Sequence, residues 1–140
     1  MNMPKFKLSS MIGEDFETCR AAGYSFRREM THAVMGALST PENWDVNGEY
    51  RSEFGGLFPV QIRFAPTHGR FEVVLCSPGE FSHDWIMLLV WKKAQEVSCI
   101  RTCAQFDSAV FSHVLSLIHR LDNDGYSIFD IIATLSMEVA

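Results

Sequence analysis

Four cysteines and five histidines are the side chains of this sequence with the clearest capacity for chemistry. Cys76 stands at the expected end of a strand, where His68 or His83 could approach it as the base of a nucleophilic pair. That chemistry needs a lowered thiol pKa and a partner within hydrogen-bond reach, and the sequence indicates neither. A buried strand cysteine is the commoner arrangement, and we expect Cys76 to be one.

A metal site is the second chemistry to consider. Cys99 and Cys103 are four residues apart, a spacing that brings two thiols together only on a helix. The residues around them predict a strand, on which the two would stand roughly 13 Å apart. No C-x-x-C pair is present, and Gly55–Gly56 lacks the context of a nucleotide-binding loop. We therefore expect no metal, no cofactor and no enzymatic activity.

The charge balance disfavours nucleic acid as a direct ligand. The chain has 17 acidic and 12 basic side chains, a net charge of −5. Proteins that bind nucleic acids usually present a basic face to the phosphates, but the longest basic clusters here are Arg27–Arg28 and Lys92–Lys93. We expect no direct nucleic-acid binding, and an acidic chain suits a basic surface on another protein.

The negative charge resides in two segments, 40–54 and 106–140, each with a single arginine. Solvated loops and helix caps are the ordinary explanation for such charges, and Asp107 and Asp130 are expected at helix N-termini, where the helix dipole favours them. If the fold brings the two segments together, they form one acidic surface. The acidic residues that remain are our candidates for partner binding: Glu42, Asp45, Glu49, Glu53, Asp122 and Asp124.

Apolar spacing predicts helices at both ends of the chain. A first stripe runs from Leu8 to Cys19, with Gly23 as a suitable end, and a second helix follows from the cap Ser25 to Leu38. Near the C-terminus, one stripe extends from Phe106 to Leu121. Ser127 and Asp130 have capping-box spacing and open a last helix.

Strands are predicted between the helices. Residues 60–64 and 71–75 alternate apolar and polar side chains, and residues 85–91 are apolar throughout, which predicts a central strand covered on both faces. Residues 48–54 and 96–102 suit two further strands. Short connections favour an antiparallel meander. The prediction is a single α+β domain over residues 1–140, with two N-terminal helices, a four- or five-stranded mainly antiparallel sheet and two C-terminal helices.

Neither a membrane span nor an export signal is expected. The longest uncharged apolar run, residues 85–91, is far shorter than the roughly 20 residues that cross a bilayer. The N-terminal apolar stretch is interrupted by serines and Glu14. We expect a cytoplasmic protein with free thiols.

Several runs resemble the plasmid SOS inhibition protein B (PsiB) family. The similarity covers almost the whole chain and rests on residues 27–35, 43–44, 47–50, 52–64, 75–79, 125–127 and 130–132. The resemblance implies a protein carried on conjugative plasmids that binds the RecA recombinase in solution. It further implies slower nucleation of RecA filaments on the incoming single strand, less LexA self-cleavage and a weaker SOS response, without enzymatic activity.

Alternatives stay open at this stage. The partner contact could be apolar, through Phe111, Leu115 or one face of the sheet, in place of the acidic residues. A small acidic α+β protein could also be a chaperone-like protein-binding module. A hydrolase would require turnover that depends on Cys76.

Overall fold

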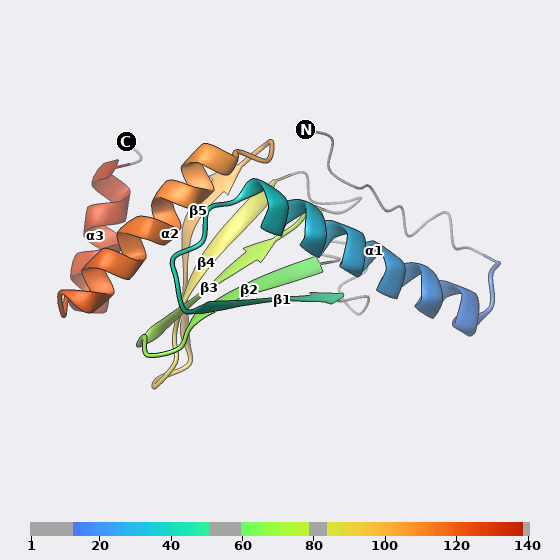
Figure 1. The fold of residues 1–140 in the computed structure, drawn as a ribbon, viewed down its shortest axis with the longest axis horizontal. Coiled ribbons are helices and arrows are strands. Elements are labelled where there is room, and N and C mark those ends of the chain that lie inside the picture. The colour runs from blue at the N-terminus through green and yellow to red at the C-terminus, as the bar shows by residue number, and fades with distance from the viewer. Residues whose placement is uncertain (1–12, 51–59, 79–83, 139–140) are drawn as a thin grey trace.

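The computed structural model describes residues 13–50, 60–78 and 84–138. In chain order the elements are α1 (Phe16–Ala37), β1 (Trp44–Tyr50), β2 (Val60–Pro66), β3 (Phe71–Cys76), β4 (Trp85–Trp91), β5 (Glu96–Cys103), α2 (Ser108–Asn123) and α3 (Ile128–Glu138). The five strands form one sheet in the order of the chain, and every neighbouring pair is antiparallel (Figure 1). This is the meander that the short connections predict.

The prediction of two N-terminal helices is wrong. One helix, α1, runs without interruption from Phe16 to Ala37, with Asp15 as its N-cap, so Gly23 is no helix end and Ser25 is no cap. Gly23 does not adopt the left-handed conformation that ends helices, and an interior glycine costs a helix only about 1 kcal/mol. The predicted helical stripe before residue 13 lies outside the described residues.

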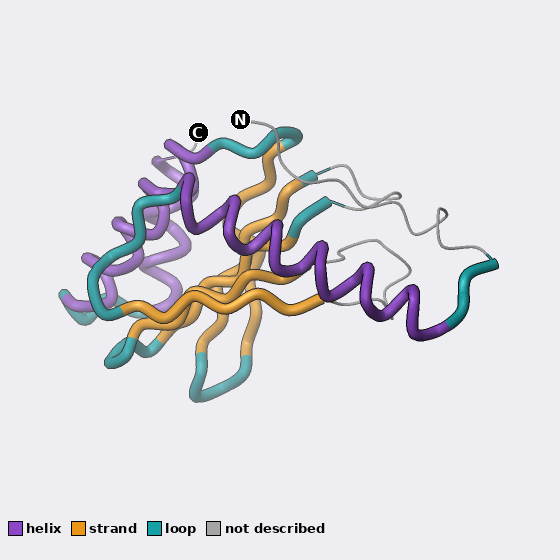
Figure 2. The backbone as a smooth tube through the Cα atoms, turned by 45° about the vertical axis from the view of Figure 1, so that its right-hand side comes forward, coloured by secondary structure: helices purple, strands orange, loops and turns teal. Residues whose placement is uncertain are grey.

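All three helices lie on one face of the sheet (Figures 1 and 2). α1 packs on β1 and β2, and α3 packs on α2 and β5. Alternate strand residues point into this layer, and β2 shows the pattern most clearly, because Val60, Ile62 and Phe64 have no exposed surface. Each large apolar side chain buried in this way stabilises the fold by roughly 1.5–3 kcal/mol. The core is therefore a single layer between one sheet face and three helices.

The opposite sheet face carries no described helix, and this corrects the prediction for residues 85–91. In β4 Trp85, Met87 and Leu89 are buried, whereas the residues between them are only half-buried. The strand is also fourth of five rather than central. The outer side chains of β4 are therefore shielded only in part, by their neighbours on the sheet. Among the described residues no second layer of helices covers them.

The edge strand β1 begins at Trp44, before the predicted start at residue 48. It passes so close to α1 that a Cβ atom on Gly48 would collide with the side chain of Thr31. That side chain is held in place, because its hydroxyl donates to the Arg27 carbonyl at 2.8 Å. The glycine is therefore required by the close approach of helix and strand.

Replacing Gly48 by alanine should lower the free energy of unfolding by about 1–3 kcal/mol, because the new methyl group overpacks the α1–β1 contact. Urea denaturation followed by circular dichroism measures the change. Gly36→Ala is the matched control, since a Cβ there meets open space and should leave stability equal or slightly higher. Adding Thr31→Ala to Gly48→Ala should recover part of the loss; no recovery would contradict the proposed collision.

Candidate functional site

The start of β1, the β2–β3 turn and the C-terminal end of α2 surround a hollow of ≈ 340 Å³. Three separate stretches of chain meet here, so only the tertiary fold creates it. Its lining is polar and includes carboxylate, imidazole, amide and indole groups from Glu42, Trp44, His68, His119, Asp122 and Asn123. The described residues thus offer a polar concave surface as a candidate binding site.

The hollow brings together the two acidic segments that the sequence identified. Glu42 comes from the first segment and Asp122 from the second. Asp45 on β1 and Asp124 after α2 are exposed but do not line the hollow. The side chain of Glu49, and Glu53 as a whole, lie outside the described residues. The structure thus joins one residue from each segment and leaves the other described candidates at its margins.

Asp122 forms an ion pair within the chain and is not a freely available charge. Its Oδ1 accepts from the Arg70 Nε at 2.6 Å, and its Oδ2 accepts from the Arg70 backbone N–H at 3.0 Å. The side chain of Asp122 is only 9 % exposed, so both carboxylate oxygens are committed in a largely desolvated position. We conclude that Asp122 holds the β2–β3 turn in place beside α2, and that Glu42 supplies the negative charge that a partner could contact.

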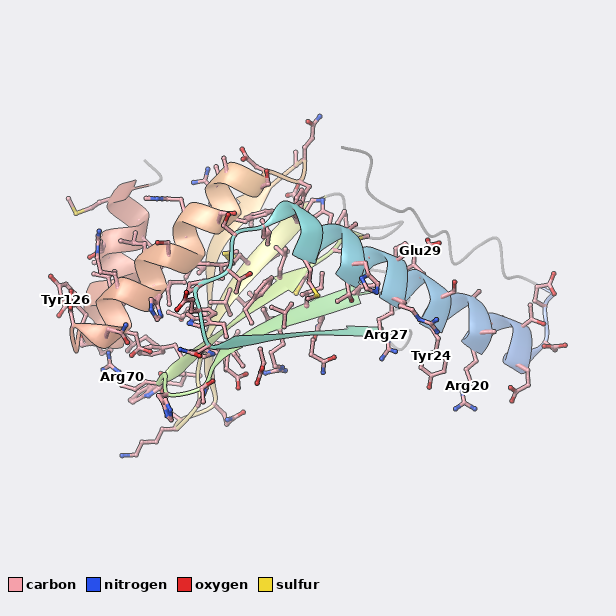
Figure 3. The ribbon with its side chains drawn as sticks, viewed as in Figure 1. Arg20, Tyr24, Arg27, Glu29, Arg70 and Tyr126 are labelled. Atoms are coloured by element: carbon pink, nitrogen blue, oxygen red, sulfur yellow. The ribbon has the colours of Figure 1, made fainter. Side chains whose placement is uncertain are left out.

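Arg70 ties two turns together around this ion pair, and Figure 3 shows it beside Tyr126 at one end of the molecule. Its Nη2 donates to the carbonyl oxygens of Asp122 at 3.2 Å and Tyr126 at 2.6 Å, and its guanidinium carbon lies 5.0 Å from the centre of the Phe71 ring. Gly69 permits the approach, because a Cβ there would lie 2.9 Å from Asp122 Oδ2. The β2–β3 turn is therefore fixed against the α2–α3 connection.

The opposite wall is formed by Trp44 and His119. The Trp44 indole N–H donates to His119 Nδ1 at 3.1 Å, and the rings pack edge to face at 5.8 Å. Because an indole N–H can only donate, Nδ1 of a neutral His119 is the acceptor and Nε2 carries the proton. The Asn123 Nδ2 lies 3.3 Å from Nε2 and also donates, so a hydrogen bond between them requires the Asn123 amide to turn its oxygen toward Nε2. Protonating Nδ1 would remove the acceptor and break the contact with Trp44.

Asn43 closes the wall beside Glu42. It adopts a left-handed conformation, with φ of 66°, and its carbonyl oxygen accepts from both the backbone N–H and the hydroxyl of Thr67. These two hydrogen bonds attach the residue just before β1 to the β2–β3 turn. Glu42, exposed at this point, has no ion-pair partner among the described residues.

Nucleophilic chemistry finds no support at Cys76. His68 precedes β3 and Cys76 ends it, so the two occupy opposite ends of one strand; His83 lies outside the described residues. Burial, and to a lesser degree the nearby Cys99, raises the pKa of the Cys76 thiol to about 11. The thiol is thus protonated at neutral pH, the opposite of what a nucleophile needs. Among the described residues no His, Cys, Asp and Glu side chains gather in a group able to hold a metal ion.

The apolar contact that rested on Phe111 and Leu115 is also corrected. Both side chains have no exposed surface, because α2 turns them into the core. Their helical phase placed them off the main stripe, but α2 is flanked by the sheet and by α3 and buries more than one stripe. The open sheet face remains apolar in part, and Val97 on it is 57 % exposed.

The chain matches a known protein family over most of its length. The family model described as "Plasmid SOS inhibition protein (PsiB)" matches residues 4–139, almost the entire chain. Within the part of the chain that the structure describes, no helix has both the length and the apolar character needed to cross a membrane.

Cys76 should resist thiol reagents in the folded protein. At pH 8 we expect exposed Cys99 to react rapidly with Ellman's reagent and Cys76 to react only after denaturation. Because the unfolded thiol loses its proton first, stability should fall as the pH rises from about 9 to about 11. Cys76→Ala should reduce that slope. Rapid labelling of Cys76 in the native protein would contradict its burial.

Removing the Asp122 carboxylate should loosen the hollow. Asp122→Ala should lower the free energy of unfolding by about 1–3 kcal/mol, because it removes an ion pair and a buried acceptor of the Arg70 backbone N–H. Asp124→Ala is the matched control: the Asp124 side chain is exposed and forms none of these contacts, so the change should stay within about 0.5 kcal/mol. Equal losses for the two variants in urea denaturation would refute the structural role of Asp122.

Proposed function

Because the chain belongs to the plasmid SOS inhibition protein (PsiB) family, we propose that it restrains the SOS response by binding RecA. Inhibition of the SOS response by a plasmid protein is what the family description states. The finer steps are our proposal: the protein binds RecA in solution during conjugative plasmid entry, slows filament nucleation on single-stranded DNA, and so limits LexA cleavage.

The exposed carboxylate at the hollow supports contact with a protein rather than with DNA. A net charge of −5 and the exposed carboxylate of Glu42 at the hollow oppose the approach of a phosphate backbone. The same charges attract a basic face on a protein and speed its association. We place the contact at Glu42, with the exposed Asp45 and Asp124 as further candidates. Glu49 and Glu53 stay in the proposal on their charge alone, because Glu53 and the side chain of Glu49 lie outside the described residues.

Sequestration requires no catalysis, and we propose that the protein is not an enzyme. RecA bound by the inhibitor is withdrawn from the nucleation equilibrium in proportion to the concentration and affinity of the inhibitor. Nothing in this scheme needs a cofactor or a reactive thiol, in keeping with the protonated state of Cys76.

Mixing the two purified proteins without DNA tests the proposal. We expect a complex at micromolar concentrations by size-exclusion chromatography and biolayer interferometry. We also expect a longer lag before RecA hydrolyses ATP on single-stranded DNA, because this lag reports nucleation. A failure to form any complex at these concentrations would refute RecA sequestration, and a complex that needs DNA would indicate a different mechanism.

Charge reversal locates the contact. Glu42→Lys with Asp45→Lys should slow association with RecA about fivefold or more at low salt, and the difference should shrink as salt screens the charges. Glu29→Lys is the control, an exposed glutamate on α1 far from the hollow (Figure 3). If the double variant and the control bind RecA equally fast at low salt, the acidic surface does not carry the contact.

A further inference from the structure

The N-terminal half of α1 projects beyond the edge of the sheet (Figures 1 and 2). The rest of the helix anchors it to the core, because Phe26, Met30 and Val34 are buried there. The residues on the projecting part cannot rotate into the core without removing these anchors. Its outward face is therefore presented at a fixed orientation.

Two arginines and a tyrosine form a cluster on this outward face. Arg20, Tyr24 and Arg27 follow the helical spacing that places side chains in one row, and Figure 3 shows them pointing to the same side of the helix. Each guanidinium carbon lies 5.4 Å from the centre of the Tyr24 ring. The two guanidinium carbons are therefore separated by at most twice this distance. The Tyr24 side chain between them remains 43 % exposed.

Within the described ranges, the cluster has no counter-charge of the kind that surface arginines usually find. No carboxylate of the described residues lies within salt-bridge distance of Arg20 or Arg27. Figure 3 shows Glu29 pointing away from the cluster. Glu17 precedes Arg20 on the helix and forms no ion pair with it. A guanidinium that uses its face on an aromatic ring keeps its N–H edge available for a carboxylate.

We propose that the Arg20–Tyr24–Arg27 cluster binds an acidic segment of a partner protein. In an extended peptide, alternate residues point to the same side about 7 Å apart, so two acidic residues separated by one other can each meet a guanidinium. The Tyr24 ring fixes the separation of the two cations in advance, which reduces the entropy lost on binding.

Charge favours such a peptide over nucleic acid. Glu14, Asp15 and Glu17 stand at the start of the same helix, and the whole chain is acidic. A long polyanion that followed the cluster would meet these carboxylates, whereas a short segment with two or three acidic side chains need not. The cluster therefore suits a local acidic sequence.

Fluorescence anisotropy with a defined probe tests this inference without RecA. The probe is a labelled peptide in which glutamate alternates with glycine, added to the full chain at low salt. We expect binding that Arg20→Gln with Arg27→Gln weakens about tenfold. The charge-matched control, Lys93→Gln with Arg120→Gln, removes two exposed cations elsewhere and should weaken it less than twofold. Circular dichroism checks that each variant keeps its helix content.

Tyr24→Leu separates the ring from simple charge attraction. It keeps both arginines and should weaken peptide binding about threefold, because the guanidinium groups lose their common support. Equal losses in the double variant and its charge-matched control, or no binding by the unaltered protein, would overturn the proposal. Tighter binding of a labelled oligothymidylate than of the peptide would also overturn it, in favour of a nucleic-acid site. None of these outcomes depends on whether the protein binds RecA.

Discussion

Burial of a single sheet face against three helices is the constraint on which this structure depends. In β2 and β4 every second residue enters that layer, so the register of each strand decides which side chains are buried and which are left outside. The consequences reach the candidate surfaces. The hollow exists because α2 crosses the core and ends beside the β2–β3 turn, and α1 projects because its C-terminal part alone packs on β1 and β2.

The Arg70–Asp122 ion pair shows how the molecule separates structural charges from available ones. The two residues are 52 positions apart, yet Arg70 binds both the side chain and the carbonyl oxygen of Asp122. A carboxylate with both oxygens occupied cannot also attract a partner strongly. Glu42 shares the hollow but forms no such contact with the described residues, and its environment rather than its charge makes it the better binding residue.

Much of this fold could be predicted from local patterns. Alternation located β2 and β3, and short connections predicted the antiparallel meander. The predicted helix break at Gly23 was wrong because a glycine ends a helix only where the chain turns left-handed, and Gly23 keeps a helical backbone inside an α1 that runs from Phe16 to Ala37. Local patterns could not predict that Phe111 and Leu115 would be buried, because that depends on what surrounds α2.

Of the candidate site, only the two acidic residues could be predicted from the sequence. Charge counting selected Glu42 and Asp122 because the two acidic segments are visible in sequence. Arg70, Trp44 and His119 were missed, since their contacts join residues 52 to 75 positions apart and no spacing rule connects them. The cation–π cluster on α1 is different: Arg20, Tyr24 and Arg27 have helical spacing, so a search for aromatic residues flanked by arginines at that spacing would have found it.

The Glu42 carboxylate and the arginine cluster carry opposite charges, and the hollow and the cluster lie at opposite ends of the molecule, with Arg70 and Tyr126 near the hollow and Arg20 in the cluster (Figure 3). Such a separation of charges orients the protein as it approaches a charged partner, because a charge that attracts one of the two surfaces repels the other. A partner with only basic charge would engage the hollow but repel the arginine cluster. The protein would then discriminate between partners through repulsion of like charges as much as through attraction of opposite charges.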